Sequence, residues 1–216
     1  GLYARTESLF QNTPMAARDL PTPTEVALLE PFRDSLREEI FTRVYEQPKT
    51  DGSGNNRHNL RIAKKLLQEA GYTVKDGKLT TPKGEPVTME YLTFSPGFER
   101  VVAPLISNLK RLGIEATIRI VDTAQYTNRL HEFDFDLTMA AFGTVATPGL
   151  GERALWGSDV ANSPGTINYA GIADPVVDAL IEKIGNAPDR QSLETAARAL
   201  DRVLLWNRYV IPAWFN

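Results

Sequence analysis

One stretch, residues 85–142, limits the fold more than any other part of the chain, because strand and helix patterns alternate along it. Residues 87–93 and 114–121 are short runs rich in β-branched, aromatic and alternating apolar residues, which is typical of strands. Between them, residues 98–112 place apolar side chains at helical spacing, and Gly113 follows as a typical helix stop. The order strand, helix, strand is the start of a βαβ unit.

The same stretch continues with a second helix and a third strand. Residues 122–130 have a capped helix pattern, and residues 135–142 form a nearly all-apolar run. Strands that alternate with helices pair in parallel, so we predict an α/β fold with a βαβαβ core sheet flanked by helices. Ligands of such sheets meet the loops at the carboxyl ends of the strands. The loops expected there are residues 94–98, 122–126 and 142–149.

Aromatic side chains mark these loops and the segment beyond them. Phe94, Phe98, Phe142 and Trp156 lie at, or just after, the predicted strand ends. Each ring taken alone is equally well explained as a core or lid residue. Together they favour a mostly apolar ligand cleft with a few polar groups. The polar candidates are Ser95, Thr144 and Asn168.

The first 56 residues lack sustained periodicity and contain several prolines, so we interpret residues 1–56 as an irregular segment that covers a core. A short strand is expected within residues 38–45. We assign residues 57–216 to the α/β core and the whole chain, 1–216, to a single lobe. Further elements are expected as a helix at 60–70, a hairpin turning at Asp76-Gly77, a helix capped by Asp174, a last helix starting at Asp189 or Arg190, and a strand at 210–214.

Composition excludes several classes of site. The chain has no Cys, which removes disulfides, thiolate nucleophiles and thiolate metal ligands, and its two His residues form no zinc signature. A formal charge of −3 favours no nucleic acid, and no Walker or dinucleotide-binding glycine motif is present. No apolar run reaches the roughly 20 residues that span a bilayer. We therefore expect no cofactor, no metal and no nucleic-acid partner.

Acid–base catalysis by carboxylates is the alternative chemistry. Asp134 and Asp136 flank one residue at the start of the predicted third strand, on a common face. That is the end of the strand away from the ligand loops, so we interpret both as edge and turn residues. An α/β enzyme that uses Asp122, Asp134 or Asp136 as acid or base stays open as an alternative.

From about Arg57 to Trp214 the sequence resembles the C-terminal lobe of family 5 extracellular solute-binding proteins, the peptide- and nickel-type subunits of bacterial ABC importers. The resemblance rests on an ordered series: LLQEAGY at 66–72, LKRLGI at 109–114, FDFDL at 133–137, and NY at 168–169 followed by DPVVDAL at 174–180. The opening GLYARTESLFQN and the run LLEPFRDSL are similar to the subgroup associated with peptides and peptide-like antibiotics.

The resemblance implies a periplasmic-binding-protein-like lobe that closes on its ligand with a second lobe and performs no chemistry on it. It also implies that this chain is one lobe of a larger protein, whose signal peptide lies outside the chain. The implied partners are a peptide or peptide-like ligand and an ABC permease in the inner membrane. We expect a periplasmic monomer. A sensor domain of a transcription regulator is a further alternative.

Only a few functional residues carry over. In peptide-binding relatives, the loop after the third strand presents backbone groups and an Asp that pairs with the ligand's amino group. Here that loop includes Phe142, Gly143 and Thr144, and Thr144 stands near the Asp position. Because Thr offers no countercharge, the resemblance implies blocked, modified or longer peptides, or other solutes, as ligands. Arg129 and His131 match a region that supplies basic contacts to a ligand carboxylate in some relatives.

Overall fold

The computed structural model describes residues 4–143 and 147–215. Its contacts divide the chain into two compact units. We call residues 48–140 the sheet unit, and residues 1–47 together with 141–216 the helical unit. The α/β class is confirmed. The assignment of the whole chain to a single lobe, with a covering segment at 1–56 and a core at 57–216, stays a prediction.

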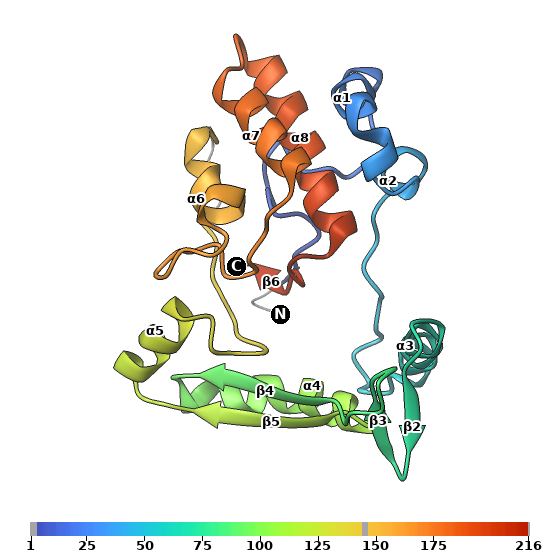
Figure 1. The fold of residues 1–216 in the computed structure, drawn as a ribbon. Coiled ribbons are helices and arrows are strands. Elements are labelled where there is room, and N and C mark those ends of the chain that lie inside the picture. Colours follow the sequence, from blue (N-terminus) through green and yellow to red (C-terminus); the bar gives the residue numbers. More distant parts are fainter. Residues whose placement is uncertain (1–3, 144–146, 216) are drawn as a thin grey trace. The chain divides into compact units, whose positions relative to one another are not determined.

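The elements follow one another as Figure 1 labels them. Those of the sheet unit are α3 (Arg57–Glu69), β2 (Thr73–Lys75), β3 (Lys78–Thr80), β4 (Thr88–Thr93), η2 (Pro96–Phe98), α4 (Glu99–Arg111), β5 (Glu115–Ile120) and α5 (Thr123–His131). Those of the helical unit are β1 (Ala4–Arg5), α1 (Pro23–Leu29), η1 (Glu30–Ser35), α2 (Glu39–Thr42), η3 (Leu150–Glu152), α6 (Arg153–Trp156), η4 (Ser158–Val160), α7 (Pro175–Gly185), α8 (Arg190–Asn207) and β6 (Trp214–Phe215).

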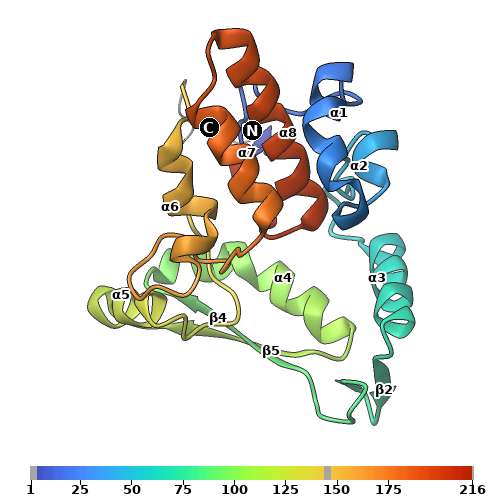
Figure 2. The same ribbon diagram turned by 45° about the horizontal axis from the view of Figure 1, so that its top comes forward.

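The parallel strands β4 and β5 form the centre of the sheet unit. They pair over their full lengths, from Thr88 opposite Glu115 to Thr93 opposite Ile120, and α4 connects them. Figures 1 and 2 both show α4 running along this strand pair. The buried core consists of Leu79, Tyr91, Val102, Ile106, Ile114 and Ala116. The βαβ unit predicted from residues 87–121 is therefore confirmed.

The expected third strand at 135–142 is much shorter in the structure. It is reduced to a single parallel bridge between Leu137 and Tyr91, on the side of β4 away from β5. Leu92 donates its N–H to the Leu137 carbonyl at 2.8 Å, and Leu137 donates to the Glu90 carbonyl at 3.1 Å. Just after the bridge, the Leu92 carbonyl of β4 accepts the Thr138 side-chain hydroxyl at 3.2 Å, and the segment leaves the sheet. The prediction of a full third strand over 135–142 was therefore wrong, although one residue of the run does pair with the sheet.

The hairpin of β2 and β3 is confirmed at the predicted turn. Asp76 and Gly77 both have positive φ, 50° and 78°, as the tightest two-residue hairpins require. The helix predicted at 60–70 is α3, which starts three residues earlier, at Arg57.

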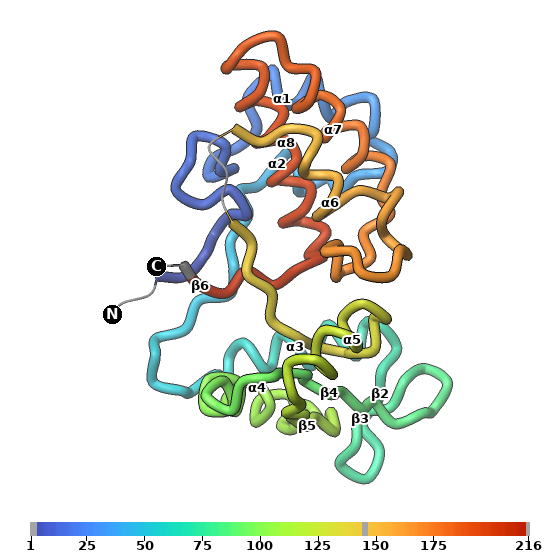
Figure 3. The backbone as a smooth tube through the Cα atoms, turned by 90° about the vertical axis from the view of Figure 1, so that its left-hand side faces the viewer, coloured from blue at the N-terminus to red at the C-terminus, as the bar shows by residue number. Residues whose placement is uncertain are grey.

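The long helices α7 and α8 form the centre of the helical unit, and Figure 3 shows them side by side. Asp174 caps α7 by accepting the Val176 N–H, as expected from the sequence. The last helix, expected to start at Asp189 or Arg190, is α8: it starts at Arg190, and Asp189 caps it by accepting the Ser192 N–H. The apolar faces of both helices bury residues such as Val177, Leu200 and Leu204 completely, since none of the three has any exposed surface. Helix α1 also packs on α8.

The strand expected within residues 38–45 is a helical turn instead. Residues Glu39–Thr42 form α2, in which the Thr42 hydroxyl donates to the Glu38 carbonyl at 3.0 Å. Ile40 is completely buried in the core of the helical unit. Burial of this one side chain, rather than the β-branched composition of the segment, decides the local conformation. The final strand, β6, covers only Trp214–Phe215 and pairs antiparallel with β1.

Across residues 4–143 and 147–215, we find no helix that combines the length and the apolar character needed to cross a membrane.

Candidate functional site

The carboxyl end of β4 carries an apolar side chain that is not buried. Phe94 follows the last residue of the strand directly and is 49% exposed, although residues 91–93 before it are buried. The next residue, Ser95, donates its N–H to the Thr93 hydroxyl at 3.2 Å, which holds the backbone as it leaves the sheet. Phe98, half-buried, donates its N–H to the Ser95 carbonyl at 3.1 Å and begins the turn into α4.

Helix α5 brings a second aromatic ring to Phe94. Asp122 caps α5 by accepting the Gln125 N–H at 2.8 Å, so the first turns of the helix lie at the end of β5. Tyr126 lies on the second turn. Its ring centroid is 5.0 Å from that of Phe94, with the planes tilted by 56°. This distance is in the range that attractive aromatic pairs prefer.

The hydroxyl of Tyr126 is tied to the segment that follows α5. It lies 2.9 Å from the Thr138 hydroxyl and 3.3 Å from the Met139 carbonyl. Thr138 in turn donates to the Leu92 carbonyl of β4 at 3.2 Å. The two rings are thus connected to the backbone of the parallel sheet.

Tyr126 lies at the end of the segment 122–126 that was expected at the ligand edge, but it was not singled out as a contact, and Thr138 was not expected at all. The signal that could have found Tyr126 is its place four residues after the capping Asp122, on a helix that starts at the carboxyl edge of the sheet. Thr138 gave no such signal, because its partners come from β4 and α5.

Tyr91 lies inside the core of the sheet unit and is 4% exposed. Its hydroxyl has no hydrogen-bond partner among the residues that the structure describes. Burial, and secondarily the phenol of Tyr126, raise the pKa of Tyr91. This group therefore stays neutral at physiological pH.

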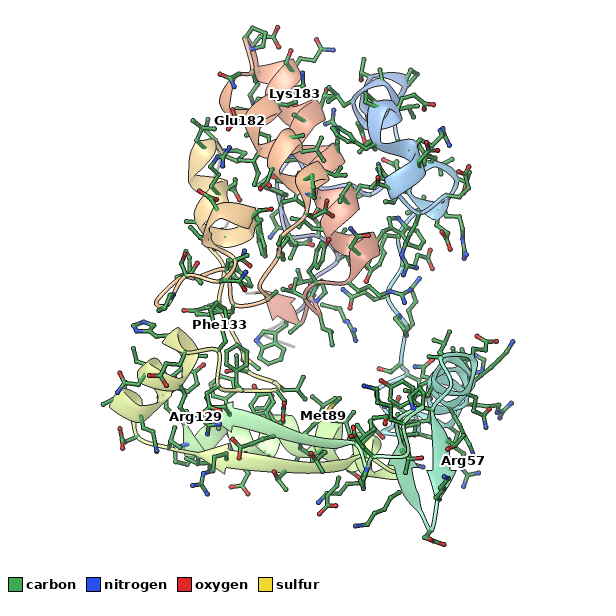
Figure 4. The ribbon with its side chains drawn as sticks, in the orientation of Figure 1. Arg57, Met89, Arg129, Phe133, Glu182 and Lys183 are labelled. Atoms are coloured by element: carbon green, nitrogen blue, oxygen red, sulfur yellow. The ribbon has the colours of Figure 1, made fainter. Side chains whose placement is uncertain are left out.

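The two basic candidates on α5 differ in their surroundings. The guanidinium of Arg129, whose place is labelled in Figure 4, pairs with Glu90 at 2.8 Å and with Asp134 at 2.7 Å. The bond to Asp134 is the main cause of a raised pKa at Arg129. His131 is exposed in the last turn of the helix. The charge of Arg129 is thus already balanced by two carboxylates. Its contact with a ligand stays a prediction, as does that of His131.

The three carboxylates of the enzyme alternative all have structural partners. Asp122 caps α5, Asp134 pairs with Arg129, and Asp136 accepts the Glu90 N–H at 2.8 Å. Within the described part of the chain, no group of three or more His, Asp or Glu residues could hold a metal ion.

In the helical unit, Phe142 and Trp156 contact one another, with ring centroids 5.1 Å apart. Trp156 is 3% exposed, and its indole N–H donates to Glu152 at 3.1 Å. Burial raises the pKa of this Glu152 carboxyl. Gly143, after Phe142, is exposed, while Thr144 lies outside the described residues.

Asn168 is completely buried and binds only backbone groups of its own unit. Its side-chain amide donates to the carbonyls of Gly157 at 3.1 Å and Ile172 at 3.0 Å, and its side-chain oxygen accepts the Ile172 N–H at 2.9 Å. These bonds hold the segment before α7 in place. The structure therefore brings Phe94, Ser95 and Phe98 together in one unit, and Phe142 and Trp156 together in the other.

Residues 5–163 match the family model described as "Bacterial extracellular solute-binding proteins, family 5 Middle". The chain belongs to this family. The expectation that it resembles family 5 solute-binding proteins is confirmed.

Curated relatives of this family 5 chain match along its whole length. It is 44% identical to the "Probable peptide-binding protein YejA" of Agrobacterium fabrum, over all of this chain and 35% of that protein. It is 33% identical to the "Peptidoglycan-binding protein YepA" of the same organism, again over all of this chain and 35% of the relative. The chain thus spans about a third of the length of these relatives.

Solved structures of solute-binding proteins share the fold. The oligopeptide-binding protein AppA of Bacillus subtilis, in complex with a nonapeptide, has a TM-score of 0.63 at 17% identity, over 96% of this chain and 42% of that one. The periplasmic oligopeptide-binding protein TM1223 of Thermotoga maritima, bound to mannohexaose, has a TM-score of 0.65 at 20% identity, over 94% and 40% of the two chains. At these identities the likeness shows the fold alone.

Proposed function

We propose that this chain forms part of the substrate-binding subunit of a bacterial ABC importer for oligopeptides or peptide-like solutes. The observation that carries the proposal is the 44% identity, over the whole chain, to a relative named as a peptide-binding protein. Membership of an extracellular solute-binding family supports the same conclusion.

In this proposal the loop after β4 supplies one wall of the ligand site. Phe94 offers exposed apolar surface, Ser95 a hydroxyl, and Phe98 a half-buried ring at the start of α4. Phe142, Gly143 and Thr144 are further proposed ligand contacts, carried over from the family resemblance, and so are Arg129 and His131. Trp156 and Asn168, the remaining expected contacts, are buried and bonded to Glu152 and Gly157, so in this proposal they act through the segments they hold in place.

Affinity in this proposal comes from burial of apolar surface and from hydrogen bonds to the peptide main chain. The importer subunit performs no chemistry on the ligand and works in the periplasm as a monomer. It delivers the ligand to a permease in the inner membrane and binds no nucleic acid.

The test begins with native mass spectrometry of the gene-length protein as purified, followed by denaturation to release bound molecules. We expect a released mass of peptide character, and a rise in melting temperature when peptide pools are added to the emptied protein. An emptied protein that neither shifts in melting temperature nor binds any peptide in calorimetry would overturn the proposal.

A variant pair tests the proposed wall. Phe94→Ala should weaken peptide binding roughly tenfold, because burial of about 50 Å² at ~25 cal/mol per Å² contributes about 1.3 kcal/mol. Val101→Ala is the matched control, since Val101 is a similarly exposed apolar residue on α4, 46% exposed. Equal affinities of the two variants would remove Phe94 from the site.

A further inference from the structure

A continuous series of contacts connects the backbone of β4 to the exposed ring of Phe94. Thr138 donates to the Leu92 carbonyl, the Tyr126 hydroxyl lies 2.9 Å from the Thr138 hydroxyl, and the Tyr126 ring lies 5.0 Å from Phe94. Each member is fixed by the one before it. The ring at the surface is therefore held by the most regular part of the unit, its parallel sheet.

Core packing does not account for this arrangement. The buried core of the sheet unit, and the half-buried apolar residues packed against it, include neither Phe94 nor Tyr126. Tyr126 is only half-buried, and Phe94 keeps about half of its surface exposed, 49%. An aromatic pair that is tied down yet contributes little to the core has a different use.

A ring that is fixed before the ligand arrives loses little rotamer freedom on binding. Such preorganisation strengthens association, because ordering a free side chain at an interface costs free energy. The hydroxyl bonds of Tyr126 limit the rotation of its own ring and so limit the positions open to Phe94.

We propose that Tyr126 is a positioning residue that holds Phe94 as a stacking platform, and that this platform selects ligands carrying a planar apolar group, such as an aromatic side chain of a peptide. The inference rests on the proposed function, which it extends from peptides in general to a preference among them. A planar group can adopt the offset or edge-to-face geometry that aromatic pairs prefer, whereas a saturated group of the same size gains only burial.

The test compares two series of tetrapeptides on the gene-length protein by isothermal titration calorimetry. One series carries a single Phe at each position of an Ala background, and the other carries cyclohexylalanine, which has the same carbon skeleton without the flat ring. We expect the tightest Phe peptide to bind about three- to tenfold more tightly than its saturated counterpart.

Variants then test which side chains produce this preference for Phe over cyclohexylalanine. Phe94→Leu and Tyr126→Leu should both bring the ratio close to one. Tyr126→Phe, which keeps the ring but loses the hydroxyl bonds, should give a ratio between one and the wild-type value. Thr138→Val should resemble Tyr126→Phe, while Thr138→Ser, which keeps the hydroxyl, should restore the wild-type ratio. Tyr72→Phe is the matched control, because Tyr72 is a half-buried ring packed against the core. Melting temperatures confirm that each variant is folded.

The outcomes separate the two proposals. A wild-type ratio near one, or an unchanged ratio in Phe94→Leu, overturns the platform while peptide binding itself stands. An unchanged ratio in a folded Tyr126→Leu variant overturns the positioning role. A protein that binds no peptide of either series and shows no melting shift with the peptide pools overturns the proposed function, and the inference with it.

Discussion

The carboxylate of Asp201 in α8 accepts a hydrogen bond from the Ser8 hydroxyl at 2.7 Å, although the two residues are 193 positions apart. The same carboxylate accepts the backbone N–H groups of Leu9 and Ala17, each at 2.8 Å. Asp201 is completely buried. One side chain of α8 therefore fixes the path of the first residues of the helical unit.

Asp201 should make the protein less stable as the pH rises, which is the opposite of the usual effect of a carboxylate. Burial raises its pKa from an ordinary 3.8 to about 6, against the opposing effect of the hydrogen bonds from Ala17, Ser8 and Leu9. Between pH 3.8 and about 6 the folded state thus binds more protons than the unfolded state. The stability that Asp201 contributes is therefore complete below about pH 4 and is lost as the pH rises through about 6. The loss is on the order of 3 kcal/mol.

The measurement is urea unfolding of the wild type and Asp201→Asn between pH 4 and 7. We expect the unfolding free energy of the wild type to fall, relative to that of Asp201→Asn, as the pH rises through this range. Asp34→Asn is the control, because Asp34 is an exposed carboxylate of η1. Parallel curves for the wild type and Asp201→Asn would contradict the prediction.

A second buried charge joins α1 to α8. Glu25 pairs with Arg202 at 2.9 Å and with Arg198 at 3.1 Å, and the side chains of Glu25 and Arg202 are 1% and 2% exposed. Glu25→Gln should lower the unfolding free energy by roughly 3 kcal/mol, because a buried guanidinium loses its countercharge.

Glu30→Gln is the matched control for Glu25→Gln. Glu30 pairs with Arg33 at 3.0 Å, but both side chains are largely exposed. We expect a change below about 1 kcal/mol in chemical denaturation, as for most surface pairs. Similar losses in the two variants would show that burial does not decide the strength of these pairs.

Gly113, which follows α4, should not tolerate a side chain. Its φ is +88°, and a Cβ atom there would lie 2.7 Å from the Leu79 nitrogen. That same nitrogen donates to the Gly113 carbonyl at 2.8 Å, so the hairpin strand β3 has no room to withdraw without losing the bond. Gly113→Ala should cost about 3 kcal/mol, in which left-handed strain adds to the collision.

The hairpin glycine Gly77 separates these two causes. Its φ is +78°, but a Cβ atom would meet nothing within 4 Å. Gly77→Ala should therefore cost only about 1–2 kcal/mol from backbone strain. Equal losses of melting temperature in the two variants would rule out the collision as the dominant cause at Gly113.

Asn168 should affect stability rather than ligand recognition. Asn168→Ala removes three buried hydrogen bonds to Gly157 and Ile172, which should cost roughly 3 kcal/mol. Asn162→Ala, at an exposed position nearby in sequence, should cost less than about 0.5 kcal/mol. A folded Asn168→Ala variant with normal stability but weakened peptide binding would instead place Asn168 in the site.

The helices were the most predictable part of this chain. The cap at Asp174, the helix start at Asp189 or Arg190 and the helix stop at Gly113 were all correct, because caps and helical periodicity depend on neighbours only a few residues away. The hairpin at Asp76-Gly77 was predictable for the same local reason.

Candidate site residues were harder to judge, because burial is not a local property. Asn168 and Trp156 are residue types that often line ligand sites, yet both are buried in the helical unit, and Trp156 is part of its core. The segment that ends at Tyr126 was expected at the ligand edge, but the bond of its hydroxyl to Thr138 was not, since Thr138 comes from a later part of the chain.

The sequence by itself determined the family, the α/β class and the order of the helices, because these depend on local periodicity and on motifs in a fixed order. Only the tertiary structure decided that residues 135–142 contribute one bridge instead of a strand, and that residues 39–42 form a helical turn. It also decided which charges are buried, as in the pairing of Glu25 with Arg202. The physical reason is that sheet pairing, burial and ion pairing depend on residues brought together from distant parts of the chain, whereas helix caps and turns are complete within a few residues.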